Sequence, residues 1–150
     1  MGATHFSGPV VSGDLQSGET NGPNQGFAVL SQSTSITQNS TTAVSSTLYI
    51  PAGSRIVDFN IDVLTAYNSA TSATLTIGTA AAGTQYVGSI DAKTAGRAAI
   101  TYSAAQLAAM NGVTVTGTAA ATTPPVVVTV TPVGATSAGY VVVTVLYVQQ

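Results

Sequence analysis

The sequence predicts an all-β fold, a β-sandwich with a jelly-roll-like or Greek-key-like path, and three observations support this prediction. Apolar and polar residues alternate in many short runs, which is the period of a strand with one buried and one wet face. Turn residues separate these runs about every ten positions, as they do in sandwiches. One stretch alone, near residues 104–110, has a helical pattern. A chain of 150 residues fits a single domain of this kind.

Residues 1–26 differ from the rest and predict an extended N-terminal arm. Six glycines and two prolines fall in this segment, which has little periodicity. Such a segment lacks the apolar surface that would fold it alone, so it is either a disordered terminus or an arm laid across a neighbouring molecule. The β-sandwich domain then occupies residues 27–150. The candidate partner-binding residues are the sizeable apolar side chains of the arm: Phe6, Val10, Val11 and Leu15.

The first strands of the domain are short. Residues 27–30 form an apolar run, and the polar residues 33–42 predict a second strand or a loop. Residues 44–50 alternate and predict a third strand. Pro51 and Gly53 then predict a chain reversal, because proline presets φ for a turn and glycine suits the turn's end.

A long alternating pair of strands follows, within residues 48–79, and the rest of the chain is organised around it. The first strand has an apolar row expected to face the core, with Val57, Phe59, Ile61 and Val63, and a polar row expected in solvent, with Asp58, Asn60 and Asp62. A loop around Asn68 leads to the second strand. There the expected inner row is Ala73, Leu75 and Ile77.

The remaining chain predicts more strands around one helix. Residues 85–91 and 97–102 have strand patterns, and Ser103 and Gln106 then have the spacing of a capping box that opens a helix of about two turns. Residues 113–118, 126–130 and 139–148 again predict strands, with Pro132 and Gly134 as turn residues between the last two. In the final run, residues at both odd and even positions are apolar, so we expect a central strand covered on both faces.

The composition argues against several classes of function. Only 5% of the residues are charged, against about 25% in ordinary soluble domains, so we expect partner subunits to cover much of the surface. The three cations, Arg55, Lys93 and Arg97, are too few to neutralise a run of phosphates, which argues against nucleic acid. No apolar run reaches the length of a membrane-spanning helix. Cysteine is absent, which excludes disulfides and thiolate metal sites.

The residues for catalysis are sparse. His5 is the only histidine and lies in the arm, so a Ser-His-Asp triad is not indicated. Asp58 and Asp62 are about 13 Å apart along a strand, too far for a glycosidase pair. With Asn60 they match the start of an EF-hand loop, but Val63 replaces the loop's glycine and Ser69 its final glutamate. We therefore predict no enzyme activity, no cofactor and no metal.

Three stretches resemble small structural proteins of tailed-bacteriophage heads: ATHFSGPVVS, YIPAGSRIVDFNIDVLTAYNSATSATLTIGT and DAKTAGRA. The resemblance implies a β-sandwich decoration, or cement, protein that binds the major capsid protein on the outer surface of the virion. It would be made in the host cytoplasm without a signal peptide. It also implies self-association, with a trimer favoured and a monomer or dimer possible. No functional residues carry over beyond the scaffold and the arm.

An alternative is a carbohydrate-binding or adhesive sandwich, such as a tail-fibre or receptor-binding module. The six tyrosines are the residues that could line a sugar site, although they are scattered over the predicted strands. This alternative requires either a cluster of exposed aromatic residues or a calcium site, and the sequence shows neither clearly.

Overall fold

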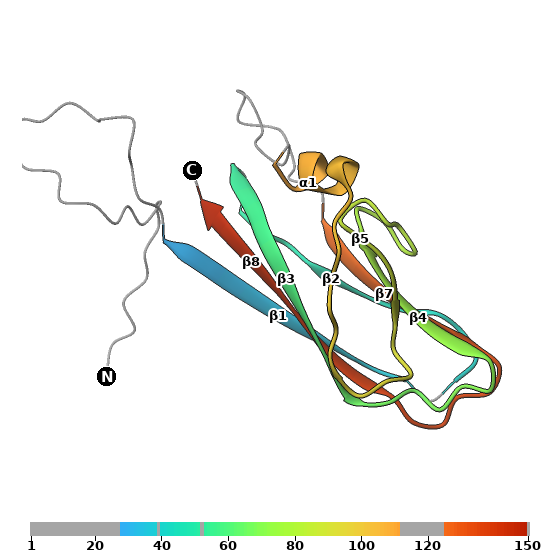
Figure 1. Ribbon diagram of the computed structural model, residues 1–150. Helices are drawn as coiled ribbons and strands as arrows, with labels where there is room; N and C mark the ends of the chain where they lie inside the picture. Colours follow the sequence, from blue (N-terminus) through green and yellow to red (C-terminus); the bar gives the residue numbers. More distant parts are fainter. Residues whose placement is uncertain (1–27, 39, 52, 112–124, 150) are drawn as a thin grey trace, which may run out of the picture.

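The computed structural model describes residues 28–38, 40–51, 53–111 and 125–149, which form two antiparallel sheets packed face to face (Figure 1). The predicted all-β sandwich is confirmed. One four-stranded sheet, here the β1 sheet, has the order β1-β8-β3-β6, and the other, the β2 sheet, has the order β2-β7-β4-β5. In chain order the elements are β1 (Val29–Thr37), β2 (Val44–Leu48), β3 (Ser54–Thr65), β4 (Ser72–Gly78), β5 (Val87–Asp91), β6 (Gly96–Arg97), α1 (Ala104–Asn111), β7 (Val126–Val133) and β8 (Tyr140–Gln149).

The strand order is that of a jelly roll. β1 pairs with β8, β2 with β7, β3 with β6 and β4 with β5, as in one long hairpin whose two arms are rolled up together. The contacts of β8 with β3 and of β7 with β4 complete the two sheets. This arrangement is one of the standard ways to build a double-sheet β domain. It confirms the jelly-roll form of the predicted path.

The core lies between the sheets and consists mainly of β-branched side chains, which suit a pleated surface. The predicted inner row of β4 is confirmed, since all its members are buried. Between the sheets, Phe59 and Tyr86 place their ring centroids 6.1 Å apart. The buried rows include Phe59, Ile61 and Val63 of β3, Ala73, Leu75 and Ile77 of β4, Val126, Val128 and Val130 of β7, and Val141, Val143 and Val145 of β8.

Two register shifts in β3 change which residues face inward. The ladder with β8 slips between Ile56 and Asp58 and again between Val63 and Thr65. The prediction that Val57 faces the core is wrong, because the first slip leaves its side chain 43% exposed and buries Ile56 in its place. An extra residue in one strand of an antiparallel pair reverses the parity beyond it.

The last two strands depart from their predicted forms. β8 is central, as predicted, but it is not covered on both faces: its inner row is buried and most of its outer row is half-buried. Pro132 lies inside β7 rather than in a turn. It is tolerated there because β2 pairs with β7 only as far as Val130, so the missing N–H of Pro132 faces a side without a neighbouring strand.

Other expected boundaries also change. The predicted strand at residues 97–102 is wrong beyond Arg97, because β6 contains only two residues. The two separate elements expected within residues 27–42 are one continuous strand, β1. The predicted turn at Pro51 is confirmed, since the Ser54 N–H donates to the Pro51 carbonyl at 3.2 Å and Gly53 has a left-handed φ of 77°. The predicted strand at residues 113–118 lies outside the described residues.

The predicted helix and its cap are confirmed. The Gln106 N–H donates to Ser103 Oγ at 3.3 Å, and the Ser103 N–H donates to Gln106 Oε1 at 2.9 Å. This reciprocal pair satisfies two N–H groups at the start of α1 that have no partner within the helix. Met110 is the buried residue of α1, which packs beside β3 at one end of the sandwich (Figure 1).

The opposite end of the sandwich is closed by polar contacts between loops. Asn68 accepts backbone N–H bonds from Ser137 and Ala138 at 2.9 and 3.1 Å, which joins the β3–β4 and β7–β8 connections. Tyr67 is 1% exposed, and its hydroxyl donates to the Ile36 carbonyl at 3.0 Å. The Tyr67 ring lies so close to Gly139 that a Cβ there would come within 2.6 Å of a ring carbon.

Candidate functional site

The charged residues of the described structure are confined to one side of the sandwich. Three acids and three bases balance each other there, whereas Asp14 and Glu19, which account for the net charge of −2, belong to residues 1–27. The six lie on β3, β5, β6 or the turn between the last two. They are Asp58, Asp62, Asp91, Arg55, Lys93 and Arg97. β1, β2, β4, β7 and β8 therefore contain no charged residue.

Two of the carboxylates stabilise local structure around β6. Arg97 donates to both oxygens of Asp62, at 2.8 and 2.9 Å, and this hydrogen bonding lowers the pKa of Asp62. Asp91 accepts the Lys93 backbone N–H at 3.0 Å and the Thr94 hydroxyl at 2.9 Å. These bonds lower the pKa of Asp91 as well. Both carboxylates are therefore ionised at neutral pH. Each accepts hydrogen bonds from β6 or from the turn between β5 and β6.

Asp58 has a structural partner too. The Tyr102 hydroxyl donates to Asp58 Oδ1 at 2.6 Å, and the Phe59 N–H donates to the same oxygen at 2.8 Å. Burial, together with this bond to Asp58, raises the pKa of Tyr102 above its ordinary range. Asp58 and Asp62 lie on the outer row of β3, as predicted, but they are not simply solvated, because each holds part of the segment 96–102 against the edge of β3. Sequence reasoning missed these partners.

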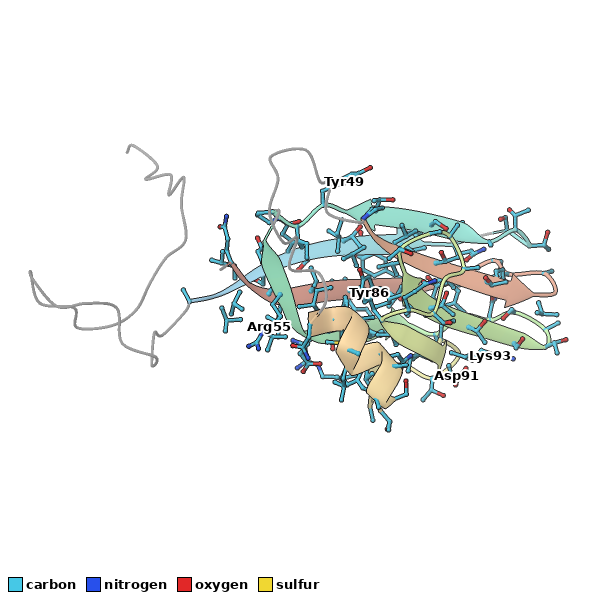
Figure 2. All side chains as sticks on the ribbon, turned by 90° about the horizontal axis from the view of Figure 1, so that it is seen from above. Tyr49, Arg55, Tyr86, Asp91 and Lys93 are labelled. Carbon is cyan, nitrogen blue, oxygen red and sulfur yellow. The ribbon has the colours of Figure 1, made fainter. Side chains whose placement is uncertain are left out.

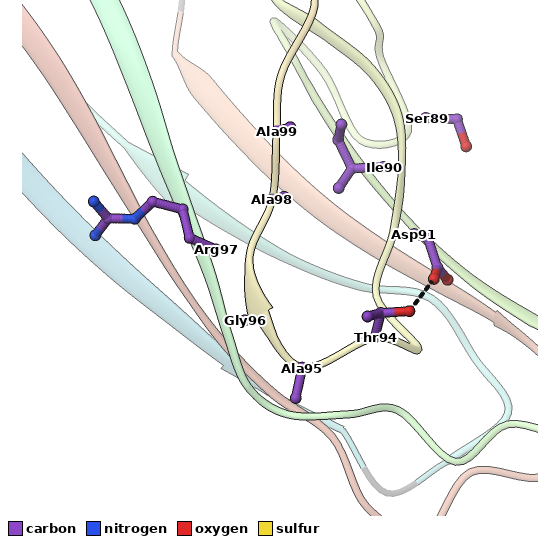
Figure 3. Close-up of a pocket in the computed structure, with 9 residues that line it drawn as sticks. All are labelled: Ser89, Ile90, Asp91, Thr94, Ala95, Gly96, Arg97, Ala98 and Ala99. Atoms are coloured by element: carbon purple, nitrogen blue, oxygen red, sulfur yellow. Dashed lines mark hydrogen bonds between the residues drawn. The ribbon is translucent and has the colours of Figure 1, made fainter.

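A hollow beside this segment offers no catalytic arrangement. Its lining comes from β5, β6 and the residues between and just after them (Figure 3). The one acidic residue in the lining, Asp91, accepts a hydrogen bond from Thr94. The side chain of Arg97 points away from the hollow towards β3 (Figure 3). Within the described ranges, no three or more His, Cys, Asp or Glu side chains gather as a metal site would require.

The tyrosines do not form the aromatic cluster that a sugar-binding surface needs. All six lie in described residues, and Tyr49 alone of them is strongly exposed, at 72%. It projects away from the sheets, whereas Tyr86 lies buried between them (Figure 2). Tyr67 and Tyr147 are buried as well. A single exposed ring gives a weak stacking surface compared with several in a row.

One accessible sheet surface is free of charged residues and is here called the uncharged face. It is made by the outer rows of β1 and β8. Small hydroxyl side chains fill its middle, where Ser33 Oγ and Thr144 Oγ1 lie 2.7 Å apart, and a shallow hollow between β1 and β8 lies beside them. By register the face consists of Val29, Ser31, Ser33, Ser35 and Thr37 of β1 and Tyr140, Val142, Thr144, Leu146 and Val148 of β8.

One end of the uncharged face is apolar. Val29 is 57% exposed there, beside Val148 of β8. On the far side of β8, Arg55 of β3 lies opposite Val148, and Val57 is 43% exposed because of the register shift described above. The centres of protein–protein interfaces are depleted of charged residues, and charge there is costly to desolvate. In its lack of charged residues, the face resembles the centre of a protein–protein interface.

Comparisons with protein-family models, curated proteins and solved structures find no match to this chain.

The predicted partner-binding residues Phe6, Val10, Val11 and Leu15 lie outside the described residues, as does His5. The uncharged face was not predicted as a site. The sequence does show that β1 and β8 contain no charged residue. It does not show that the two strands are neighbours, because they are more than 100 residues apart and are brought together by the jelly-roll pairing. In the described part of the chain, no helix has the length and apolar character needed to cross a bilayer.

Proposed function

We propose that this protein is a structural virion protein that decorates and stabilises the outer surface of a bacteriophage capsid by binding the major capsid protein. The observation that carries the proposal is the uncharged side of the jelly roll, which suits a broad protein contact. The resemblance of three sequence stretches to tailed-phage head proteins supplies the kind of partner. Jelly rolls also occur in viral capsid proteins and in lectins, so the fold alone favours neither class.

The physical requirements of a cement protein agree with this surface. Such a protein holds capsid subunits together against internal pressure, so it needs contacts that remain favourable when water is excluded. Hydroxyl and aliphatic side chains meet this need at little desolvation cost, whereas unpaired charges do not. The six charges of the described residues balance in sign and form no basic patch, so nothing draws the protein to packaged DNA, which is consistent with the outside of the shell.

The arm adds a second contact in this proposal. Residues 1–26 hold Phe6 and a pair of valines, Val10 and Val11, within a glycine-rich sequence. An extended segment of this kind can add backbone hydrogen bonds to the edge of a neighbouring sheet. In this proposal the sandwich supplies a rigid docking surface and the arm extends the contact across a subunit junction.

The proposal is tested by adding purified protein to phage heads that lack decoration and measuring occupancy by co-sedimentation. Thr144→Lys places a charge in the middle of the uncharged face and should weaken binding at least about tenfold, equal to about 1.4 kcal/mol. Ser89→Lys is the matched control, because Ser89 is an exposed residue of β5 on the side that already carries charge. Equal binding by both variants would refute docking through the uncharged face.

The arm is tested separately by deleting residues 1–20. The truncated protein should keep its thermal unfolding transition, yet bind heads more weakly than the full chain. Full occupancy by the truncated protein would refute the arm contact.

The carbohydrate-binding alternative depends on Tyr49, the one strongly exposed tyrosine. Binding to an array of glycans at micromolar affinity, lost in Tyr49→Ala, would favour that alternative over the capsid role. Cryo-electron microscopy of particles distinguishes them further, because a cement protein gives density outside the shell and a receptor-binding module gives density at the tail.

A further inference from the structure

Among the described strands, β1 has one edge without a partner. It is the first strand of its sheet and pairs with β8 on one side. Just beyond β1, the Gln38 N–H donates to the Gly139 carbonyl at 3.0 Å. In an antiparallel ladder the backbone groups of alternate residues point to opposite sides, so the even-numbered residues of β1 bond β8 and the odd-numbered ones point away from it. Among the described residues, no backbone hydrogen bond reaches these odd-numbered residues.

Within the described residues, this edge has none of the features that usually prevent strands from pairing between molecules. Proteins protect exposed edges with charges, prolines, bulges or very short strands. β1 has nine residues, VLSQSTSIT, without charge or proline, and its register with β8 is unbroken. The other strands at sheet edges are shorter: β2 and β5 have five residues each and β6 has two. β1 is thus the longest edge strand in the described sandwich.

We propose that β1 pairs antiparallel with β1 of a second copy of this chain, around a two-fold axis that passes by Ser33. Ser33 is the middle residue of β1, so this register pairs the strand over its full length. It places Ser31 opposite Ser35 of the other copy, and Val29 opposite Thr37. All of these are odd-numbered residues, which are the ones with free backbone groups, and the pairing forms about ten new hydrogen bonds.

The side chains also match in this register. On the inner face Leu30 of one copy lies opposite Ile36 of the other, and Gln32 lies opposite Thr34, so that apolar meets apolar and polar meets polar. Ser33 meets its own copy at the axis, where a charged residue would repel itself and a large one would crowd. A surface that complements itself in this way is what a two-fold interface requires. The dimer would be a departure from the trimer that the sequence resemblance favours.

A pair of cysteine variants tests the register directly, because the natural chain contains no cysteine. In the proposed dimer the two Ser33 Cα atoms lie about 5.5 Å apart, within the range that a disulfide spans. Ser33→Cys should therefore form a covalent dimer on oxidation. Ser35→Cys is the matched control, since Ser35 is equally exposed but lies four residues, about 13 Å, from the position facing its own copy. Mixing Ser31→Cys with Ser35→Cys should restore cross-linking. Equal cross-linking of Ser33→Cys and Ser35→Cys would overturn the register.

Sedimentation of the full chain tests the dimer itself. Ser33→Pro removes a free-edge N–H without removing a bond to β8, so the fold should persist while the dimer is lost. Thr144→Lys alters the neighbouring strand on the same face and should leave the dimer intact. A monomeric wild-type protein, or a dimer that survives Ser33→Pro, would overturn the proposal. Loss of the dimer on deletion of residues 1–20 would also overturn it, since the arm would then be the partner of β1. These measurements need no capsids, so their failure leaves the capsid role untouched.

Discussion

Replacing Tyr67 by phenylalanine tests how the closed end of the sandwich is stabilised. The substitution removes one buried hydroxyl, which donates to the Ile36 carbonyl at 3.0 Å. That carbonyl keeps its place in the ladder with β8, where Ile36 is registered with Val141, so no buried acceptor is left without a partner. The substitution should therefore lower the free energy of unfolding at pH 7 by about 1 kcal/mol, the contribution of a single hydrogen bond.

The same variant should behave in the opposite way at alkaline pH. Burial raises the pKa of Tyr67 to about 12, whereas an unfolded tyrosine titrates near pH 10, so the folded state favours the protonated hydroxyl. The stabilisation that this protonated hydroxyl gives the folded state is complete below pH 10 and is lost as the pH rises towards 12. By linkage, wild type loses about 2 kcal/mol by pH 12 through this group. Tyr67→Phe has no such loss, so it should be the more stable protein at pH 12 by about 1 kcal/mol.

The assay is urea unfolding followed by circular dichroism at a series of pH values, with each variant compared with wild type at the same pH. The two stability curves should cross between pH 10 and pH 12. Tyr49→Phe is the matched control: its side chain is 72% exposed, and its unfolding free energy should stay within about 0.5 kcal/mol of wild type. Parallel curves for Tyr67→Phe and wild type at every pH would refute the reasoning.

Three further substitutions test other contacts. Gly139→Ala should cost about 1–3 kcal/mol, seen as a lower melting temperature, because the new methyl group would overlap the Tyr67 ring; an unchanged melting temperature would contradict this. Ser103→Ala removes the cap of α1 and should lower stability by about 1 kcal/mol, with faster hydrogen exchange in the first helical turn; unchanged exchange there would count against the cap. Asp62→Asn breaks the pair with Arg97 and should speed exchange in β6. Because the pKa of Asp62 is lowered in the folded state, its contribution is present at neutral pH and lost as the pH falls, so the difference from wild type should disappear in acid. A difference that persists in acid would exclude the ion pair as its cause.

Local patterns predicted local structure well. Strict alternation placed the inner row of β4 in the core, and the Ser-x-x-Gln spacing located the start of α1 at Ser103. Each of these predictions depends on residues a few positions apart. The same reasoning failed at Val57, because a one-residue slip against β8 reverses the parity, and the slip is a property of two strands rather than of one.

The candidate site depended on contacts across long stretches of chain. Tyr102 reaches Asp58 over 44 positions, and nothing in the spacing of either residue indicates the other. The uncharged face requires β1 to lie beside β8, and the free edge of β1 requires that no other strand lies on its far side. Alternation identifies strands but not their neighbours. For this reason the strand order could not be predicted, although the fold class could.

The jelly-roll pairing has a consequence for how the chain folds. β8, the last strand in the described chain, lies between β1 and β3, so the β1 sheet cannot close until residues 140–149 have been synthesised. Until then β1 and β3 have no strand between them, and the edges that later pair with β8 are open to wrong partners. Contacts this distant in sequence also slow folding. We therefore expect chains that end before β8 to aggregate.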